Sequence, residues 1–411
     1  MSTLRLAAAD AQLFWLSRAV PNDQQLLYVF EANPDITAAF GQMRGNAQRC
    51  AQLQLRVCDD NRWRYPRWQP SPVTADQFLV HEGPGWPDCL DAVARLDQLD
   101  ATQMAWRVHV FPPDVVVVQI AHALADGTGS AALAGRLLGR SAPLPPVAQP
   151  VRGFLPARAV AAARAHRRLL GDVEAGLLPA PKPPRPLLSV NAPRSGASVL
   201  RTLVLDRDAL SKPTVTVGAL VAVSEALGGY LAGRGEDIGA LGAEVPIAGG
   251  PIGSTQAGNN FRNVGVDLRP DLDAPQRGAA IAAELAGQRR RAQHPATLAS
   301  DAAFATVPAW LLRWGVGLFD PSARSDTVAA HTVVSSVYRG PADLSFGGSR
   351  VLFTAGFPAL SPMMGLTHGV HGIGDTVAIS VHADPAVVDV DDYLARLADA
   401  FGSTYISPRS R

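Results

Sequence analysis

The feature that most constrains this sequence is an apolar, β-branched run that ends directly in a polar segment. Four consecutive valines occupy positions 115–118, and Gln119 and Ile120 continue the run. Such a run fits a strand covered on both faces, because a half-exposed strand alternates apolar and polar residues. The stretch 106–111 also has strand composition, and Pro112 and Pro113 separate the two. The sequence therefore predicts a buried β-hairpin over 106–123.

Helix and strand periodicities alternate along the rest of the chain, which predicts an α/β fold. A chain of 411 residues is too long for one ordinary core and favours two or three domains. Helices are expected at about 7–16, 37–47, 216–235, 274–293 and 390–401. Strands are expected at about 26–32, 53–58, 199–207, 243–249, 261–269, 331–338, 349–356 and 375–383. A glycine-rich run covers 249–260.

Two proline-rich stretches, 141–158 and 177–198, flank a basic helical segment at 157–176. Proline-rich sequence is typical of linkers between domains. We therefore divide the chain into an N-terminal part (1–140), a crossover linker with one helix (141–198) and a C-terminal part (199–411). The arginines of the helix allow peripheral contact with a membrane, but a solvated linker face is the favoured interpretation.

Composition excludes several classes of protein. A net charge of +1 gives no electrostatic footprint for nucleic acid. The three cysteines lack metal-ligand spacing and predict reduced thiols in a cytoplasmic protein. The N-terminus lacks the pattern of a signal peptide, and no run of about 18 apolar residues predicts a membrane-spanning helix. A metal site at His368 and His371 lacks clear further ligands.

The most informative segment follows the valine run and reads AHALADGTGS, with His122, Asp126 and Gly127. A tight loop with this spacing turns the imidazole toward a cavity at the end of the strand. Neutral histidine is the natural base for removing a proton from a hydroxyl or amine. A core histidine followed by an Asp-Gly turn is the simpler alternative for an isolated motif. The glycines at 127 and 129 do not fit a dinucleotide site, because the expected acidic residue is missing.

Several motifs, in order along nearly the whole chain, carry a family resemblance. The segment at 121–133 resembles the H-x-x-x-D-G active-site segment of the wax ester synthase/diacylglycerol acyltransferase family. That family shares a superfamily with the condensation domains of peptide synthetases and with plant acyl-CoA-dependent acyltransferases. Further similar pieces are LAAADAQLFWL at 6–16, LDQLDATQMAW at 96–106, LLSVNAPRS at 187–195, GNN at 258–260, VVSSVYRGP at 333–341 and the closing segment 365–393.

Two departures concern the motifs themselves. Family members usually carry two histidines before the aspartate, whereas Ala121 occupies the first position here. The signature S-N-V-P-G-P keeps Ser335, Gly340 and Pro341, but Ser336 replaces its asparagine. These departures preserve the chemistry and weaken the inference of a neutral-lipid substrate.

The resemblance implies two similar chloramphenicol-acetyltransferase-like lobes with mixed sheets and an active-site tunnel between them. His122 would be the general base, and Asp126 would brace the catalytic loop at Gly127 through a salt bridge, for which Arg56 is the candidate partner. Asn259, Ser335 and Ser336 would line the tunnel. No metal and no permanently bound cofactor are expected, and acyl-CoA would be a co-substrate.

The expected reaction moves an acyl group from a thioester to a hydroxyl or amine of a lipid or specialised metabolite, O-acyl transfer being favoured. No acyl-enzyme is expected. The alternatives are a condensation-type enzyme whose donor is bound to a carrier protein, and a repurposed member of the superfamily that is not a transferase. The sequence contains no G-x-S-x-G motif, which argues against a serine hydrolase.

Overall fold

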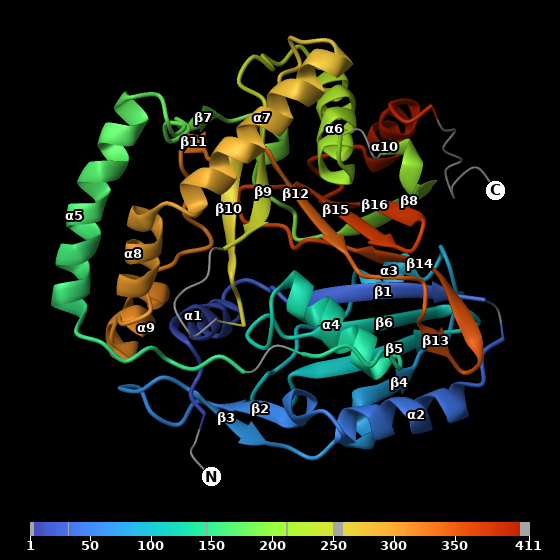
Figure 1. Ribbon diagram of the computed structural model, residues 1–411. Coiled ribbons are helices and arrows are strands. Elements are labelled where there is room, and N and C mark those ends of the chain that lie inside the picture. The colour runs from blue at the N-terminus through green and yellow to red at the C-terminus, as the bar shows by residue number, and fades with distance from the viewer. Residues whose placement is uncertain (1–3, 32, 145–146, 211–212, 250–257, 403–411) are drawn as a thin grey trace.

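The computed structural model describes residues 4–31, 33–144, 147–210, 213–249 and 258–402. Its framework is two mixed six-stranded sheets (Figure 1). Along the first sheet the order is β13 (Ser345–Phe346), β14 (Ser349–Gly356), β1 (Gln24–Phe30), β6 (Val115–Ile120), β5 (Trp106–Phe111) and β4 (Phe78–Val80). Along the second it is β10 (Phe261–Asp267), β9 (Gly242–Ala248), β12 (Thr332–Tyr338), β15 (Leu366–Ile373), β16 (Thr376–Ala383) and β8 (Val199–Asp206). The expected two-lobed α/β fold is therefore confirmed.

Helices lie on the outer faces and around the rim of the sheets (Figure 1). Those of the first lobe and its rim are α1 (Ala8–Leu16), α2 (Ile36–Gln48), α3 (Leu90–Val93) and α4 (Gly127–Leu137). Those of the linker and second lobe are α5 (Leu155–Glu174), α6 (Val215–Ala232), α7 (Ala274–Ala292), α8 (Pro295–Phe304), α9 (Ala309–Gly317) and α10 (Val390–Asp399). Small pairs are β2 (Leu55–Cys58) with β3 (Arg67–Pro70), and β7 (Arg185–Pro186) with β11 (Thr327–Val328). Short 3₁₀ turns cover Ala51–Gln54, Ala75–Gln77, Ser189–Asn191 and Arg207–Ala209.

The valine run forms β6, and all six of its residues are buried. Val116 and Val118 pack into the core beneath the helices of the first lobe. Val115 and Val117 point the other way, into a cluster with Leu200 and Ala378 of the second sheet. Successive side chains of a strand point to opposite faces, so the run needs apolar residues at every position. Burying each valine contributes roughly 1.5–3 kcal/mol.

The sheets do not follow the boundaries drawn from the sequence. Strand β14 pairs antiparallel with β1, so residues 345–356 belong to the first sheet although they lie within 199–411. This crossing of the chain between lobes was not predicted. Strand pairing joins residues about 325 positions apart here, for example Leu27 with Ala355, and no local sequence pattern specifies such a partner.

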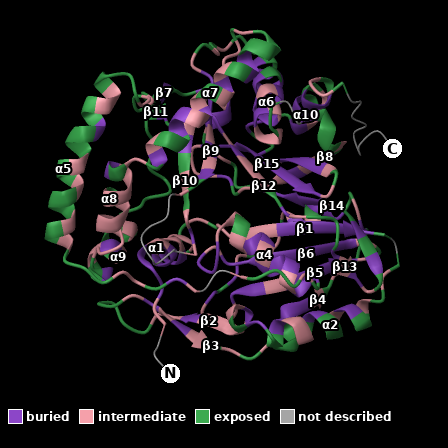
Figure 2. Ribbon diagram, in the orientation of Figure 1, coloured by how far each residue is buried: buried purple, intermediate pink, exposed green. Residues whose placement is uncertain are grey.

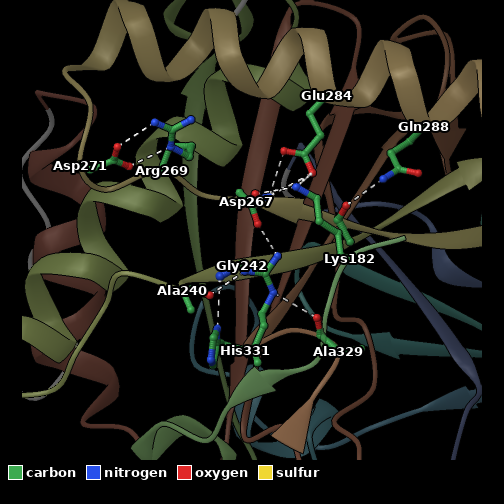
Figure 3. A network of polar contacts seen from close by, with 12 residues as sticks. Lys182, Ala240, Gly242, Asp267, Arg269, Asp271, Glu284, Gln288, Ala329 and His331 are labelled. Carbon is green, nitrogen blue, oxygen red and sulfur yellow. Dashed lines mark hydrogen bonds and ion pairs between the residues drawn. The ribbon is translucent and has the colours of Figure 1, made fainter. Parts of the chain in front are cut away.

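The linker is anchored at its end by partly buried ion pairs (Figure 3). Lys182 Nζ contacts Asp267 Oδ2 at 2.5 Å and Glu284 Oε1 at 2.8 Å, and the guanidinium of Arg185 contacts Asp267 Oδ1 at 2.5 Å. These contacts fasten the linker to β10 and α7. In the linker helix α5, Leu169 is the buried residue, and most of the helix is exposed (Figure 2).

Helix α6 corrects one expectation from the sequence. It is long and apolar enough to cross a membrane, with a mean hydropathy of 1.5 over 18 residues. No unbroken apolar run marks this helix in the sequence, because Thr216, Ser224 and Glu225 interrupt it. In the structure 61% of this window is buried, as is typical of a core helix, and it packs against α7 and α10.

Candidate active site

His122 lies in a turn between the end of β6 and the start of α4. The turn is held by backbone hydrogen bonds, from Ala121 N to Ala105 O at 2.9 Å and from Leu124 N to Ala121 O at 2.9 Å. Asp126 is the N-cap of α4. The segment after the valine run therefore folds as strand, turn and helix, and the turn presents the imidazole.

The ring of His122 is held by a residue from the second half of the chain. Its Nδ1 lies 2.7 Å from Oδ1 of Asn259. The amide nitrogen of Asn259 donates to Asp10 Oδ1 at 2.9 Å and to the backbone oxygen of His122 at 2.7 Å. A backbone carbonyl oxygen only accepts hydrogen bonds, and a carboxylate does the same when ionised. These contacts fix which end of the Asn259 amide faces the imidazole.

The orientation of this amide determines the tautomer of the imidazole. Because an oxygen of Asn259 faces Nδ1, that nitrogen must carry the proton and donate it. The second nitrogen, Nε2, is then unprotonated and has a free lone pair. This is the form that a general base requires.

Asp10, in α1, completes the chain of hydrogen bonds. Its side chain is 2% exposed and also accepts from the backbone nitrogens of Asn259 at 2.9 Å and Gly258 at 3.3 Å. Burial raises the pKa of Asp10 to about 6, against the lowering effect of these hydrogen bonds. Sequence analysis gave Asp10 no role, although the residue is part of the opening motif LAAADAQLFWL.

Burial also controls the protonation of His122. It lowers the pKa of the imidazole, and the hydrogen bond with Asn259 and the charge of Asp126 oppose this only in part. The ring of Phe261 stacks on the imidazole, with centroids 5.6 Å apart. His122 is therefore neutral at pH 7, and its neutral form is the one that can accept a proton.

These two pKa shifts predict the pH dependence of kcat/KM. The rate should be constant at neutral and mildly alkaline pH. It should fall as the pH drops below about 6, because Asp10 is then protonated and His122 follows at its lowered pKa. The measurement is a kcat/KM profile from pH 4.5 to 9. Asp10→Asn should remove the component near pH 6, and an unchanged profile in this variant would exclude Asp10 as its source.

The predicted salt bridge between Asp126 and Arg56 is wrong. The guanidinium of Arg56 donates to the backbone oxygen of Thr102 at 2.9 Å, because β2 pairs with β3 in a separate small sheet. Asp126 Oδ1 instead accepts from Gly129 N at 2.9 Å, and Oδ2 accepts from Asn260 N at 3.2 Å. Among the described residues, no cation lies within ion-pair distance of Asp126.

Asp126 thus caps α4 and ties the turn that carries His122 to the segment that carries Asn259. Its own backbone nitrogen donates to Gly258 O at 2.9 Å, which is a second tie between the same segments. The role inferred from the sequence, bracing of the loop, therefore rests on backbone contacts and not on a charge pair.

Asp126→Ala should lower the free energy of unfolding by about 0.5–2 kcal/mol, the usual cost of losing an N-cap. Activity should fall as well, because the turn that holds His122 loosens. Asp126→Asn should restore most of both, since asparagine caps helices as well as aspartate. Thermal unfolding and steady-state kinetics measure these effects. A stable but inactive Asp126→Asn protein would show that the charge takes part in the chemistry.

Gly127 lies where β12 passes the turn that carries His122. A Cβ atom on this residue would lie 3.3 Å from Cγ2 of Val337. Strand β12 can therefore approach the first turn of α4 because residue 127 has no side chain. This packing brings the second lobe against the helix that follows His122.

The two candidate serines of β12 face in different directions. Ser336 accepts a hydrogen bond from Thr216 Oγ1 of α6 at 3.0 Å, so it points into the second lobe. Ser335 shares a face of the strand with Val337, which contacts Gly127. Neither serine lines the cavity described next, so the placement of Ser335 and Ser336 in a tunnel stays a prediction.

A cavity of about 250 Å³ adjoins His122. Asn259 and Phe261, which both touch the imidazole, belong to its wall. The rest of the wall comes from α1, from α8, from residues 149 and 151 of the linker, and from Gly249, Asn260 and Arg262 of the second lobe. The cavity therefore lies between α1, the linker and the second lobe, and Asn259 and Phe261 separate it from the turn that carries His122. Part of the glycine-rich run, 250–257, lies outside the described residues.

The fold is that of known acyl-transferring and condensing proteins. A wax ester synthase/diacylglycerol acyltransferase from Marinobacter aquaeolei VT8 superposes with a TM-score of 0.61 at 17% identity, over 97% of this chain and 98% of that one. The first condensation domain of the calcium-dependent antibiotic synthetase gives 0.61 at 14% identity, over 98% and 95%. The starter condensation domain of rhizomide synthetase, as a mutant in complex with C8-CoA, gives 0.59 at 17%, over 98% and 95%.

These likenesses show that the chain has the fold of these proteins. Residues 257–404 match the family model described as the WS/DGAT C-terminal domain. This part of the chain is therefore similar to the WS/DGAT C-terminal domain, in agreement with the resemblance of the motifs. No curated protein matches it by sequence.

Proposed function

We propose that this protein moves an acyl group from a thioester to a hydroxyl or amine of a small molecule, with His122 as general base. One observation carries the proposal. The hydrogen-bond chain from Asp10 through Asn259 to Nδ1 leaves Nε2 of His122 unprotonated, and the cavity lies beside this ring.

The reaction follows from this geometry. Nε2 accepts the proton of the acceptor O–H or N–H while that oxygen or nitrogen attacks the thioester carbonyl carbon. The tetrahedral intermediate then collapses, the C–S bond breaks, and the leaving thiolate takes the proton from the imidazolium. Asn259 Oδ1 stabilises the imidazolium, since Nδ1 keeps its hydrogen bond throughout. The protein supplies no nucleophile, so the acyl group never bonds to it.

Acyl-CoA is the donor that we propose, and O-acyl transfer is favoured over N-acyl transfer because of the WS/DGAT match. A solved neighbour in complex with C8-CoA supports a CoA thioester in this fold. The condensation-type alternative uses a donor on a carrier protein, and the same fold in synthetase condensation domains favours it. No permanently bound cofactor is required. Three free cysteines are in keeping with a cytoplasmic location.

The test is product mass spectrometry with octanoyl-CoA and a panel of alcohols and amines. Ester or amide formation with octanoyl-CoA alone, lost in His122→Ala, supports the proposal. Transfer only from an octanoyl group on a carrier protein would establish the condensation-type alternative. A covalent acyl-protein trapped from donor alone would refute the mechanism, because direct transfer predicts none. No product with either donor would indicate a repurposed member of the superfamily.

A further inference from the structure

Helix α9 presents large apolar side chains to solvent. Trp310, Trp314 and Leu318 are spaced four residues apart, which places them on one face of the helix, and Phe319 follows. Trp314 and Leu318 are 61% and 63% exposed. The opposite side of the helix is buried through Ala309 and Leu312. The helix is therefore fixed to the protein by one face and displays a second apolar face outward.

Two other segments add exposed aromatic rings to the same region, at the lower left of Figure 1. Trp63, 67% exposed, lies in the loop between β2 and β3. That loop is tied to the start of α9, since Tyr65 donates to Val307 O at 2.6 Å. Phe154 precedes α5 and is also exposed, and the start of α5 is tied to α8 by Arg158. We call these residues the α9 patch: Trp63, Phe154, Trp310, Trp314, Leu318 and Phe319.

The charges around the α9 patch are mostly positive. Arg62, Arg64 and Arg152 are exposed, and none forms an ion pair with the described residues. The nearby carboxylates are largely neutralised. Asp59 pairs with Arg18 and Arg313, and Asp60 pairs with Arg67. The exposed Asp320 accepts a hydrogen bond from Ser322. Its negative charge opposes the positive charge of the nearby arginines.

We propose that the α9 patch binds an anionic lipid surface. Tryptophan is the side chain most suited to the membrane–water interface, because its ring is apolar and its N–H can remain hydrated. Exposed arginines beside such rings attract anionic headgroups. The positive charge argues against contact with a second copy of the same patch, because the arginines of two copies would repel each other.

The patch is also close to the cavity next to His122. Helices α1 and α8 both line that cavity, and α9 packs against α1, where Arg313 lies over the ring of Trp15. Binding of lipid here would place the mouth of the cavity near the membrane surface. This consequence for apolar substrates rests on the proposed function, whereas lipid binding itself does not.

The experiment measures how much of the full chain binds to vesicles at low and at high salt. The vesicles contain phosphatidylcholine with about 30% phosphatidylglycerol. The unaltered protein should bind these vesicles more tightly than pure phosphatidylcholine, and salt should weaken binding. Trp314→Glu with Leu318→Glu should weaken partition at least about tenfold, since each charge must enter the interface. Arg62→Glu with Arg64→Glu should also weaken partition about tenfold or more. Each basic residue near an anionic membrane surface contributes about 1 kcal/mol of electrostatic attraction.

A matched control keeps the test specific. Leu170→Glu alters an apolar residue on α5 that is 49% exposed, and charge reversal of Arg164, Arg167 and Arg168 alters the basic face of that helix. Both controls should bind vesicles as before.

Loss of binding in the α5 variants but not in the patch variants would move the site to α5 and overturn the proposal. The absence of vesicle binding would overturn it as well. Self-association that disappears in the patch variants, without vesicle binding, would show an interface between copies. Octanoyl transfer in solution, measured on the same variants, separates a failure of lipid binding from a failure of the proposed function.

Discussion

Replacing His122 with alanine should lower the rate of acyl transfer by about 10²–10⁴-fold, the usual contribution of a general base. The loss should appear in kcat, because the variant removes the proton acceptor while the cavity walls remain. The fold should persist, since the turn is held by backbone hydrogen bonds of Ala121 and Leu124 rather than by the imidazole. Steady-state kinetics and a thermal melt measure the two effects.

A second histidine provides the control for this prediction. His382, like His122, is half-buried, and it lies in the second lobe, where its ring contacts the backbone of Pro358 and the hydroxyl of Ser198. His382→Ala should reduce stability without a selective loss of kcat in the folded protein. Normal turnover by His122→Ala would remove His122 from the chemistry.

Asn259→Ala should lower kcat by up to about 10⁴-fold, the loss found when the acceptor that fixes the tautomer of a catalytic histidine is replaced. Without Oδ1 of Asn259, the proton of the imidazole is no longer held on Nδ1. A fraction of the molecules then carries it on Nε2 and cannot act as base. The effect on KM should be smaller, because the cavity keeps its other walls.

Asn260→Ala is the matched control, because Asn260 is adjacent, has the same side chain and lines the same cavity. It does not contact His122, so its loss in kcat should be far smaller. Asn259→Asp supplies an oxygen acceptor again and should recover part of the activity of Asn259→Ala. Equal losses in the two alanine variants would show that Asn259 only shapes the cavity.

Local pattern determined much of what the sequence could show. The valine run predicted a strand buried on both faces, and β6 is buried at every position. The amphipathic helices near 37–47, 274–293 and 390–401 were predicted within a few residues of their observed ends. Periodicity is a local property, so it can be recognised in the sequence without knowledge of the fold. Helices α8 and α9 were missed because proline, glycine and exposed tryptophan disturb their periodicity.

The motif around His122 could be found in the sequence, but its chemical environment could not. The resemblance proposed Asn259 for the tunnel wall, and the structure places it against the imidazole. Asp10 had no visible role, because its partner Asn259 is 249 positions away in the chain. Arg56 was chosen as the partner of Asp126 from its place in a strand, and that strand lies in a different sheet.

The sequence by itself determined most of the elements, the strand-turn-helix segment around His122 and the proposal of His122 as base. Each depends on residues close together in the chain, where hydrophobic period, turn chemistry and helix capping act. Only the tertiary structure decided which strands exchange between the lobes, which oxygen faces Nδ1 and which apolar side chains remain outside. These depend on contacts between distant segments, and the burial of Asp10 and His122 that sets their pKa values arises only when both halves of the chain have packed together.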